Sequence, residues 1–207
     1  MSQSVHIQLS DVSKKFGSEW IFKGITTSFD STKSYAITGP NGSGKSTLLK
    51  VIAGMVTPNR GEANWKIQEK SVLVDELYKY VAYCAPYLEL PEELNLLELL
   101  QFHQQLRSLT ISEKDFIAEL QLEPTKEIRL YSSGMKQRLK LAIAFYSKSE
   151  ILLLDEPTAT LDETWATWYI TQVKKQIQEK LVIICSNEHA EYQFCDSIIK
   201  LQDYKTT

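Results

Sequence analysis

The order of apolar and polar positions predicts short strands at both ends of the chain. Near the N-terminus, Val5, Ile7 and Leu9 alternate with polar residues, which is the pattern of a half-buried antiparallel strand. Other apolar runs and alternations predict further strands, at residues 35–37, 63–67, 151–154, 181–185 and 197–201. The first third of the chain is therefore mostly strand, whereas the last third alternates between strand and helix.

Helical periodicity fills the intervals between the later strands. It predicts helices over 46–53 with Gly54 at the end, over 91–122, from the serine-rich segment 131–134 through Ile143, and over 163–177. Alternation of strands and helices implies an α/β fold with a mainly parallel core sheet. The sequence has no internal repeat or linker, so we expect one domain, 1–207, with an antiparallel β subdomain and a helical subdomain inserted at about 87–147.

Composition and charge fit an ordinary folded domain. The chain has 207 residues, of which 43% are hydrophobic, and charges of both signs are mixed along it. A formal net charge of −3 gives no electrostatic reason to expect a nucleic-acid partner. The nearest approach to a basic patch is the cluster Lys136, Arg138 and Lys140, which we interpret as the solvated face of a helix.

Targeting signals are missing from the sequence. The N-terminus lacks the basic start and apolar region of a signal peptide, and no apolar stretch approaches the roughly 18 residues of a membrane helix. Cys84, Cys185 and Cys195 are an odd number without a CxxC motif, which is typical of buried core residues in a reducing compartment. We therefore expect a cytoplasmic protein, in which any membrane-spanning part must come from another chain.

A glycine-rich segment after the second predicted apolar strand fits the pattern GxxxxGK[ST]. In such a loop the glycines let backbone N–H groups surround phosphate oxygens, the lysine reaches the β- and γ-phosphates, and the hydroxyl of Ser46 binds Mg²⁺. The alternative is a flexible turn, but the position between a strand and a helix favours the phosphate site. The loop residues are Gly39, Pro40, Asn41, Gly42, Ser43, Gly44, Lys45, Ser46 and Thr47.

Two acidic residues end the apolar strand at 151–154. A buried parallel strand places its C-terminal end at the ligand crevice of an α/β sheet. Asp155 can therefore hold the metal, directly or through water, and Glu156, which points elsewhere, can polarise an attacking water as general base. Together with the glycine-rich loop, this pair predicts a P-loop nucleotidase.

The segment LYSSGMKQR at 130–138 resembles the signature motif of the ATP-binding cassette (ABC) family, and the resemblance covers nearly the whole chain. A Ser–x–Gly turn at a helix N-terminus is a second anion site, although an N-capping serine pair would give the same residues. The resemblance implies an ABC-type ATPase fold and a head-to-tail dimer with a second ABC subunit, either a copy or a paralogue. Each ATP would then lie between Lys45 of one subunit and a signature of the other, made of Ser132, Ser133, Gly134 and Met135.

Further roles follow from the same resemblance. Phe16 occupies the place of an aromatic that stacks on adenine, with a strand-core phenylalanine as the alternative. Asp162 would link the two sites across the dimer, although a helix N-cap explains it almost as well. The segment 88–102 resembles the linker and first helix that grip the membrane partner. The chain is thus expected to be the ATPase subunit of a transporter, peripheral at the inner face of the cell membrane, with an integral membrane permease as its partner.

Two positions depart from the family pattern. Pro86 falls where a glutamine normally contacts Mg²⁺ and the attacking water, and proline has no donor. Asn187 falls on the switch histidine; an amide can hydrogen-bond a γ-phosphate but cannot carry the imidazolium charge. His189 could substitute, although a solvent-facing histidine is the competing interpretation. With Glu156, Lys45 and Asn187 as its catalytic residues, the expected enzyme is a slow ATPase stimulated by its partner.

The sequence leaves one narrower interpretation and two competing functions open. The size of the chain, the strand around Trp65 and the absent glutamine resemble the haem-exporter ATPase of cytochrome c maturation, and ATPases of other small exporters or gliding-type systems fit nearly as well. A nucleotide-dependent switch or assembly module without a transport role is a second hypothesis, favoured by Pro86 and Asn187. A nucleotide kinase is a third, but the segment YSSGM argues against it.

Overall fold

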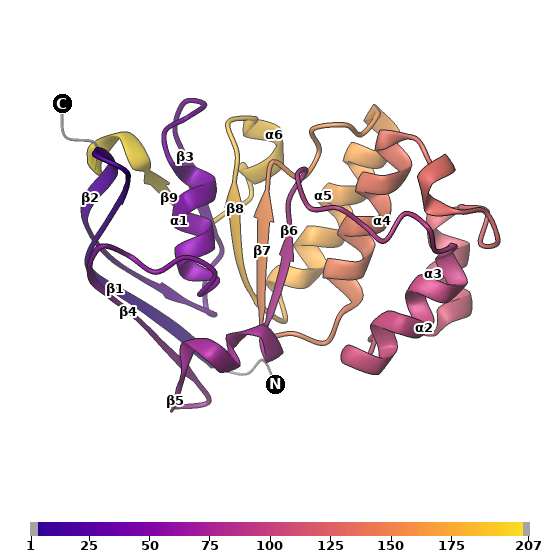
Figure 1. Cartoon of the computed structure of the whole chain (residues 1–207), viewed down its shortest axis with the longest axis horizontal. Helices are drawn as coiled ribbons and strands as arrows, with labels where there is room; N and C mark the ends of the chain where they lie inside the picture. Colours follow the sequence, from indigo (N-terminus) through magenta and orange to yellow (C-terminus); the bar gives the residue numbers. More distant parts are fainter. Residues whose placement is uncertain (1–3, 205–207) are drawn as a thin grey trace.

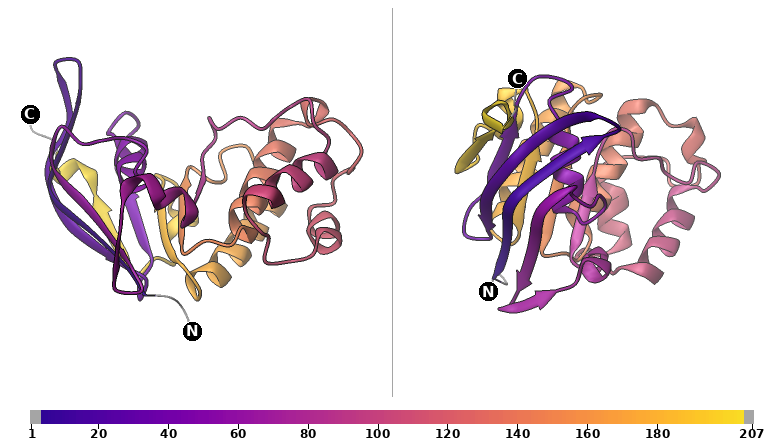
Figure 2. Two further views of the ribbon diagram at one scale, coloured as in Figure 1. Left: turned by 60° about the horizontal axis from the view of Figure 1, so that its bottom comes forward. Right: turned by 60° about the vertical axis from the view of Figure 1, so that its left-hand side comes forward.

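The computed structural model describes residues 4–204 and contains two sheets. The first is antiparallel, in the order β2-β1-β4-β5, and its strands are β1 (Val5–Phe16), β2 (Glu19–Asp30), β4 (Arg60–Ile67) and β5 (Lys70–Val72). The inward side chains of Val5, Ile7 and Leu9 are buried, which confirms the alternation predicted for the first strand. Figure 2 shows this sheet as a layer of its own, set apart from the helices that lie between residues 96 and 177.

The second sheet is parallel throughout, in the order β6-β7-β8-β3-β9. Its strands are β3 (Tyr35–Thr38), β6 (Val81–Cys84), β7 (Ile151–Asp155), β8 (Leu181–Cys185) and β9 (Ser197–Lys200). Because all these strands run the same way, their carboxyl ends meet at one edge, which is where ligands bind in open α/β sheets.

Both faces of the parallel sheet are covered, which explains the continuous apolar run of β7. Ile151 and Leu153 pack into a core shared with β1 and α1 (Lys45–Ile52), whereas Leu152 and Leu154 pack into a second core shared with the other helices. In Figure 1, α1 lies between the antiparallel sheet and β8, and the remaining long helices lie on the opposite side. The chain therefore folds as an α/β protein with an added antiparallel layer, as predicted.

The helices between β6 and β7 build the far end of the molecule. They are α2 (Leu96–Leu106), α3 (Glu113–Leu120) and α4 (Ser133–Tyr146), followed after β7 by α5 (Glu163–Ile177). Short helical turns complete the described chain: η1 (Val74–Lys79), η2 (Ile128–Leu130), α6 (His189–Tyr192) and η3 (Leu201–Tyr204). Figure 1 places α2 and α3 farthest from the antiparallel sheet, with α4 and α5 between them and β7.

The prediction of one helical stretch over 91–122 is wrong in two places. The helix begins only at Leu96, because Asn95 and Glu98 form a reciprocal capping box. It ends at Leu106, because Arg107 is extended and its guanidinium donates to the carbonyl oxygen of Val81 at 2.8 Å. α3 then starts afresh behind its own cap, Ser112.

The three cysteines differ in their burial. Cys84 and Cys185 are buried as predicted, whereas Cys195 is only half-buried, and all three are free. Within residues 4–204, none of the helices has the length and apolar character needed to cross a membrane.

Candidate functional site

The glycine-rich loop connects β3 to α1 with a backbone that side chains would not tolerate. Gly42 and Gly44 have positive φ angles of 74° and 101°. A Cβ on Gly44 would lie 2.3 Å from Cγ2 of Ile21, so the loop and β2 approach too closely for any other residue. Glycine at position 44 therefore lets the chain enter α1 directly from the loop.

Lys45, the first residue of α1, turns its ammonium group back into the loop. The side chain is buried, and Nζ donates to the carbonyl oxygens of Gly39 at 2.7 Å and Pro40 at 3.4 Å. Beside it lies an open hollow of about 400 Å³, lined by Ile21, residues 41–47 and Glu156. A cation and a helix N-terminus at one hollow form a site suited to an anion such as phosphate.

Asp155 ends β7 next to this loop with its carboxylate almost fully buried, at 1% exposure. Oδ2 accepts a hydrogen bond from the hydroxyl of Tyr87 at 3.3 Å, whereas Oδ1 has no partner among the described residues. Burial raises the pKa of Asp155, and the neighbouring hydroxyls of Ser46 and Tyr87 oppose that rise. A buried, unpaired carboxylate oxygen beside a hydroxyl fits a divalent cation.

Glu156 has a different environment from its neighbour. Its backbone is left-handed, with φ at 42°, and its N–H donates to the carbonyl oxygen of Cys185 at 2.8 Å. The turn sends the side chain outward, where it is exposed and lines the hollow beside the loop. A left-handed backbone is strained for a non-glycine residue, and such strain clusters at functional sites.

Asn187 follows β8 at the same edge of the sheet and contacts the loop directly. Its Oδ1 accepts from the N–H of Gly39 at 3.4 Å, and its Nδ2 donates to Oδ1 of Asn41 at 3.0 Å. His189 is exposed, with its ring edge against Tyr192, as the solvent-facing interpretation predicts. The structure thus brings Asn187, and not His189, against the loop.

The serine–glycine segment opens α4 at a second hollow, of about 300 Å³. Ser132 is the N-cap, and its Oγ accepts from the N–H of Met135 at 3.2 Å, so the capping interpretation holds for this serine. A Cβ on Gly134 would lie 3.0 Å from the carbonyl oxygen of Thr160, which explains the glycine. The lining comprises Ser132, Ser133, Gly134, Met135, Arg138, Thr160, Leu161, Asp162 and Trp165.

The loop hollow and the serine–glycine hollow have no lining residue in common. The structure therefore gathers Lys45, Ser46, Asp155, Glu156 and Asn187 in one place. The predicted signature residues, 132–135, line the separate serine–glycine hollow.

Phe16 and Asp162, two predicted site residues, do not line the loop hollow. Phe16 ends β1 and is 54% exposed, so the strand-core alternative is wrong for it. It is not among the residues that line the loop hollow, where Ile21 is found instead. Asp162 is the N-cap of α5, and its Oδ1 accepts from the N–H of Trp165 at 3.0 Å. The capping alternative for Asp162 is therefore correct, whatever else it does.

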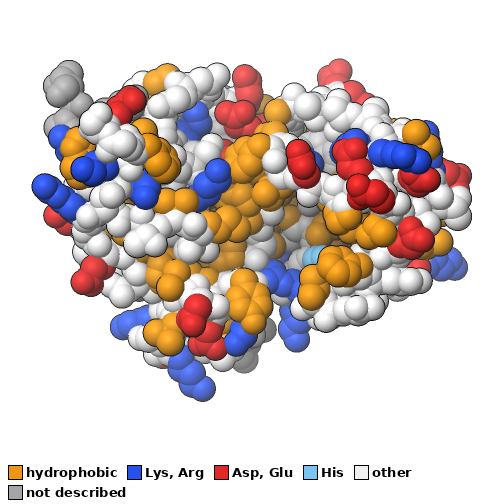
Figure 3. Space-filling view, in the orientation of Figure 1, with side chains coloured by type: hydrophobic (Ala, Val, Ile, Leu, Met, Phe, Trp, Pro, Cys, Tyr) orange, Lys and Arg blue, Asp and Glu red, His pale blue; other side chains and the backbone are white. Residues whose placement is uncertain are grey.

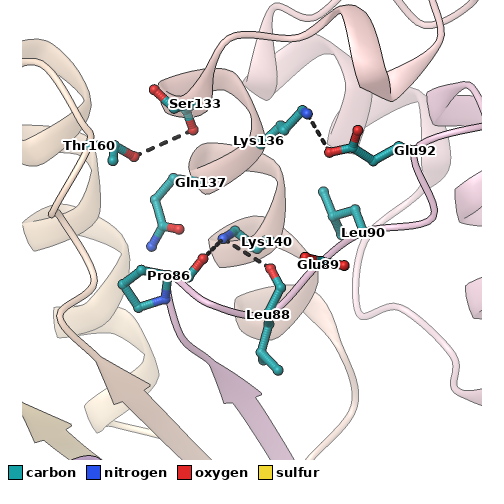
Figure 4. A pocket seen from close by; sticks show the side chains of 10 residues that line it. All are labelled: Pro86, Leu88, Glu89, Leu90, Glu92, Ser133, Lys136, Gln137, Lys140 and Thr160. Atoms are coloured by element: carbon teal, nitrogen blue, oxygen red, sulfur yellow. Dashed lines mark hydrogen bonds and ion pairs between the residues drawn. The ribbon is translucent and has the colours of Figure 1, made fainter.

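The basic cluster on α4 is not a solvated face, and that interpretation is wrong. Lys136 is ion-paired with Glu92, and Arg138 is buried with its guanidinium 3.8 Å from the ring centre of Trp165. Lys140 donates to the carbonyl oxygens of Pro86 at 2.8 Å and Leu88 at 3.2 Å, as Figure 4 shows. The three side chains bind other parts of the chain.

Sequence reasoning missed other residues at the site. Tyr87 and Lys140 are two of them, and Glu191 is a third. The carboxylate of Glu191 is buried and accepts hydrogen bonds from the backbone N–H, at 2.8 Å, and the hydroxyl of Thr158, two residues after Glu156. Only Tyr87 gave a signal, because it directly follows the departure at Pro86.

Comparison with known proteins agrees with this geometry. Residues 22–159 match the family described as ABC transporter. A relative from Escherichia coli, FetA, is named a probable iron export ATP-binding protein. It is 30% identical over 96% of this chain and 92% of its own length. A Staphylococcus haemolyticus protein, HrtA, named for hemin import, is 26% identical over 96% of this chain and 98% of its own length.

Solved structures share the fold. An ABC transporter ATP-binding protein from Pyrococcus furiosus has a TM-score of 0.78 at 24% identity, covering 97% of this chain and 100% of its own. A dimeric ATP-binding cassette bound to ADP and phosphate has the same TM-score and identity, covering 94% of this chain and 93% of its own. Since the family match covers most of its length, the chain belongs to the ABC transporter family.

Proposed function

We propose that the loop hollow binds Mg-ATP and that Glu156 activates the water that attacks it. The observation that carries this proposal is that Glu156, Lys45 and the glycine-rich loop line the same hollow. The loop N–H groups and the ammonium of Lys45 would hold the phosphates, once Lys45 exchanges its bonds to Gly39 and Pro40 for phosphate oxygens.

Ser46 and Asp155 would hold the Mg²⁺ ion. Within residues 4–204, no cluster of three or more His, Cys, Asp or Glu side chains forms a metal cage. Mg²⁺ does not need one, because it is commonly bound through one or two protein oxygens together with substrate phosphates and water. The unpaired Oδ1 of Asp155 supports this assignment. When bound, the ion would neutralise developing phosphate charge.

Hydrolysis then depends on two side chains at the sheet edge. Glu156 would polarise the attacking water as general base, and Asn187 would donate a hydrogen bond to the terminal phosphate. Loss of the glutamine at Pro86 and of the imidazole at Asn187 removes two polar contacts of the family pattern. Each such loss typically slows a reaction by on the order of 10²–10³. The proposed enzyme is therefore a slow ATPase.

The serine–glycine hollow would complete the site of a second subunit. On one chain it is separate from the loop hollow, so both anion sites serve one ATP only if two cassettes pair head to tail. Ser132, Ser133, Gly134 and Met135 would face the ATP held by the partner. Asp162 would lie at the crossing, and the exposed ring of Phe16 would stack on adenine.

A permease would dock on the helical side of the molecule. The predicted helical subdomain, residues 87–147, presents the exposed apolar side chains Leu88, Phe102 and Leu106. Figure 3 shows hydrophobic side chains gathered in the hollow between the α1 side and the helices α2 and α3. Such a surface fits a protein partner, and we propose a cytoplasmic chain bound at the inner face of the cell membrane. The relatives' names, hemin import and iron export, differ in direction, so the proposal names no cargo and the haem-exporter likeness stays a prediction.

Glu156→Gln tests the proposed chemistry. The amide keeps the shape of the side chain but cannot accept a proton, so single-turnover hydrolysis should fall by about 10²- to 10⁴-fold while ATP affinity is retained. Glu62→Gln, at an exposed position of β4, is the matched control and should hydrolyse ATP at the parent rate. An unchanged rate in Glu156→Gln would show that another group is the base.

Purification from detergent-solubilised membranes tests the transport role. We expect the chain to co-purify with a stoichiometric multi-spanning protein. Recovery only in complexes of water-soluble proteins would favour the switch or assembly module instead.

A further inference from the structure

A short chain of hydroxyl groups leads from β6 to the buried carboxylate of the site. The hydroxyl of Tyr83, on β6, is hydrogen-bonded to the hydroxyl of Tyr87. Tyr87 in turn donates to Oδ2 of Asp155 at 3.3 Å. Since a hydroxyl has one proton to donate, donation from Tyr87 to Asp155 means that Tyr83 donates to Tyr87.

The backbone on both sides of Tyr87 is fixed to α4. Nζ of Lys140 donates to three carbonyl oxygens of this segment, at 3.4 Å on Ala85, 2.8 Å on Pro86 and 3.2 Å on Leu88. Figure 4 shows Lys140 on α4 with dashed lines to Pro86 and Leu88, the residues before and after Tyr87 in the sequence. The strand-to-helix segment that carries Tyr87 is therefore held by the same helix whose N-terminus carries the signature residues.

The ring of Tyr87 also contacts the helix of the phosphate loop. Nζ of Lys50, on α1, lies 4.3 Å from the centre of this ring, within the range of a cation–π contact. Within the described segment 85–88, Tyr87 is thus the residue whose side chain contacts both α1 and β7. Tyr87 is nevertheless 47% exposed, so core packing does not explain why its hydroxyl turns inward to Asp155.

We propose that Tyr87 is a positioning residue for Asp155 and takes over part of the work of the amide that Pro86 cannot supply. By occupying Oδ2, its hydroxyl would fix the rotation of the carboxylate and leave the unpaired Oδ1 available to a cation. This inference rests on the proposed Mg-ATP site.

The test is Tyr87→Phe, which removes one oxygen atom from a half-exposed ring. Mn²⁺ serves as the metal probe, and its binding to the complex of the protein with a non-hydrolysable ATP analogue is followed by electron paramagnetic resonance. We expect the affinity for Mn²⁺ to fall by about 10- to 100-fold, the usual cost of losing a group that orients a metal ligand. Binding of the analogue without metal, in EDTA, should be unchanged.

Two further tyrosine variants make the result specific. Tyr78→Phe removes an equally large phenol oxygen from a side chain that is 68% exposed, and should bind Mn²⁺ like the parent protein. Tyr83→Phe removes only the donor behind Tyr87, and should lower the affinity less than Tyr87→Phe does.

Tyr87→Phe with the parent's affinity for Mn²⁺ would overturn the inference, as would an equal loss in Tyr78→Phe. A loss of analogue binding in EDTA would also overturn it, because it would indicate a purely structural role. If the parent protein itself bound neither the analogue nor Mn²⁺, the proposed function would fail, which is a different outcome.

Discussion

Adjacent carboxylates with opposite surroundings define the site at the scale of single residues. Asp155 is buried at the end of β7, whereas Glu156 is exposed one residue later. The cause is the left-handed turn at Glu156, which is held by its N–H bond to Cys185 on the neighbouring strand. One carboxylate is thereby buried beside the loop, where the proposed cation would bind, and the other remains accessible to water.

Asn187→Asp should weaken ATP binding by about tenfold or more, which corresponds to about 1.4 kcal/mol. The new carboxylate would still accept from Gly39, but it would place a negative charge against a loop that receives phosphates. Titration calorimetry with ATP measures the effect. Asn64→Asp makes the same charge change at an exposed position of β4 and should leave the affinity unchanged. Equal affinities in both variants would remove Asn187 from the site.

Individual residues were predictable where a local pattern specifies them. The loop glycines, Lys45, Asp155 and Glu156 follow from the motifs because strand–loop–helix geometry determines their position. The prediction that Lys136, Arg138 and Lys140 form one solvated helix face is wrong, because residues two apart do not lie on the same face of a helix. Positions 136 and 140 share one face of α4 and reach the segment 86–92, whereas Arg138 turns to Trp165. The hydroxyl contact of Tyr87 needs tertiary structure and could not be predicted.

At the scale of elements, α4 is the helix that connects the parts of the site. Its N-terminus carries the signature residues, and Lys140 in its middle holds the segment of Tyr87. At its other end, Nζ of Lys180 donates to the carbonyl oxygens of Phe145 at 2.9 Å and Ser147 at 3.0 Å. A lysine beside β8 thus satisfies carbonyls that the end of a helix leaves without partners.

Lys180 makes the stability of the fold depend on pH. Burial lowers the pKa of Lys180 to about 8, so between about pH 8 and its ordinary value of 10.5 the unfolded chain binds more protons there than the folded chain. The contribution of Lys180 to the free energy of unfolding therefore rises with pH across this window and is smallest below it. Relative to Lys180→Met, the parent protein should gain on the order of 1–3 kcal/mol between pH 7.5 and 10.

Urea denaturation of both proteins at a series of pH values measures this difference, because the titrations of all other groups are common to the pair. Lys148→Met, at an exposed position nearby, should follow the parent profile. Parallel profiles for the parent and Lys180→Met would mean that Lys180 keeps its ordinary pKa in the folded chain.

Element boundaries were predictable where a cap marks them. α5 and β8 have the bounds expected from the sequence, since Asp162 caps the helix and the apolar run of β8 is short and continuous. The sequence predicts one helix over 91–122 because its leucines keep a helical spacing across the break. The break itself depends on Arg107 reaching the carbonyl of Val81, which is a contact between distant segments.

At the scale of the whole molecule, each chain has two separate hollows, which under the proposed head-to-tail pairing are halves of two sites. The loop hollow contains the groups that would bind and hydrolyse Mg-ATP, and the serine–glycine hollow contains the groups that would form a separate anion site. The sequence predicted this arrangement through the family resemblance. Composition and periodicity alone give the α/β fold but not the need for a second subunit.

Size-exclusion chromatography of the Glu156→Gln variant with Mg-ATP tests the central claim most directly. ATP that is bound but not hydrolysed should hold two cassettes together, so the variant should elute as a dimer with Mg-ATP and as a monomer without it. Lys45→Ala, which weakens phosphate binding, should remain a monomer in both conditions. A Glu156→Gln protein that binds Mg-ATP tightly yet stays monomeric, alone and when mixed with the other cassette chains of its cell, would contradict the account.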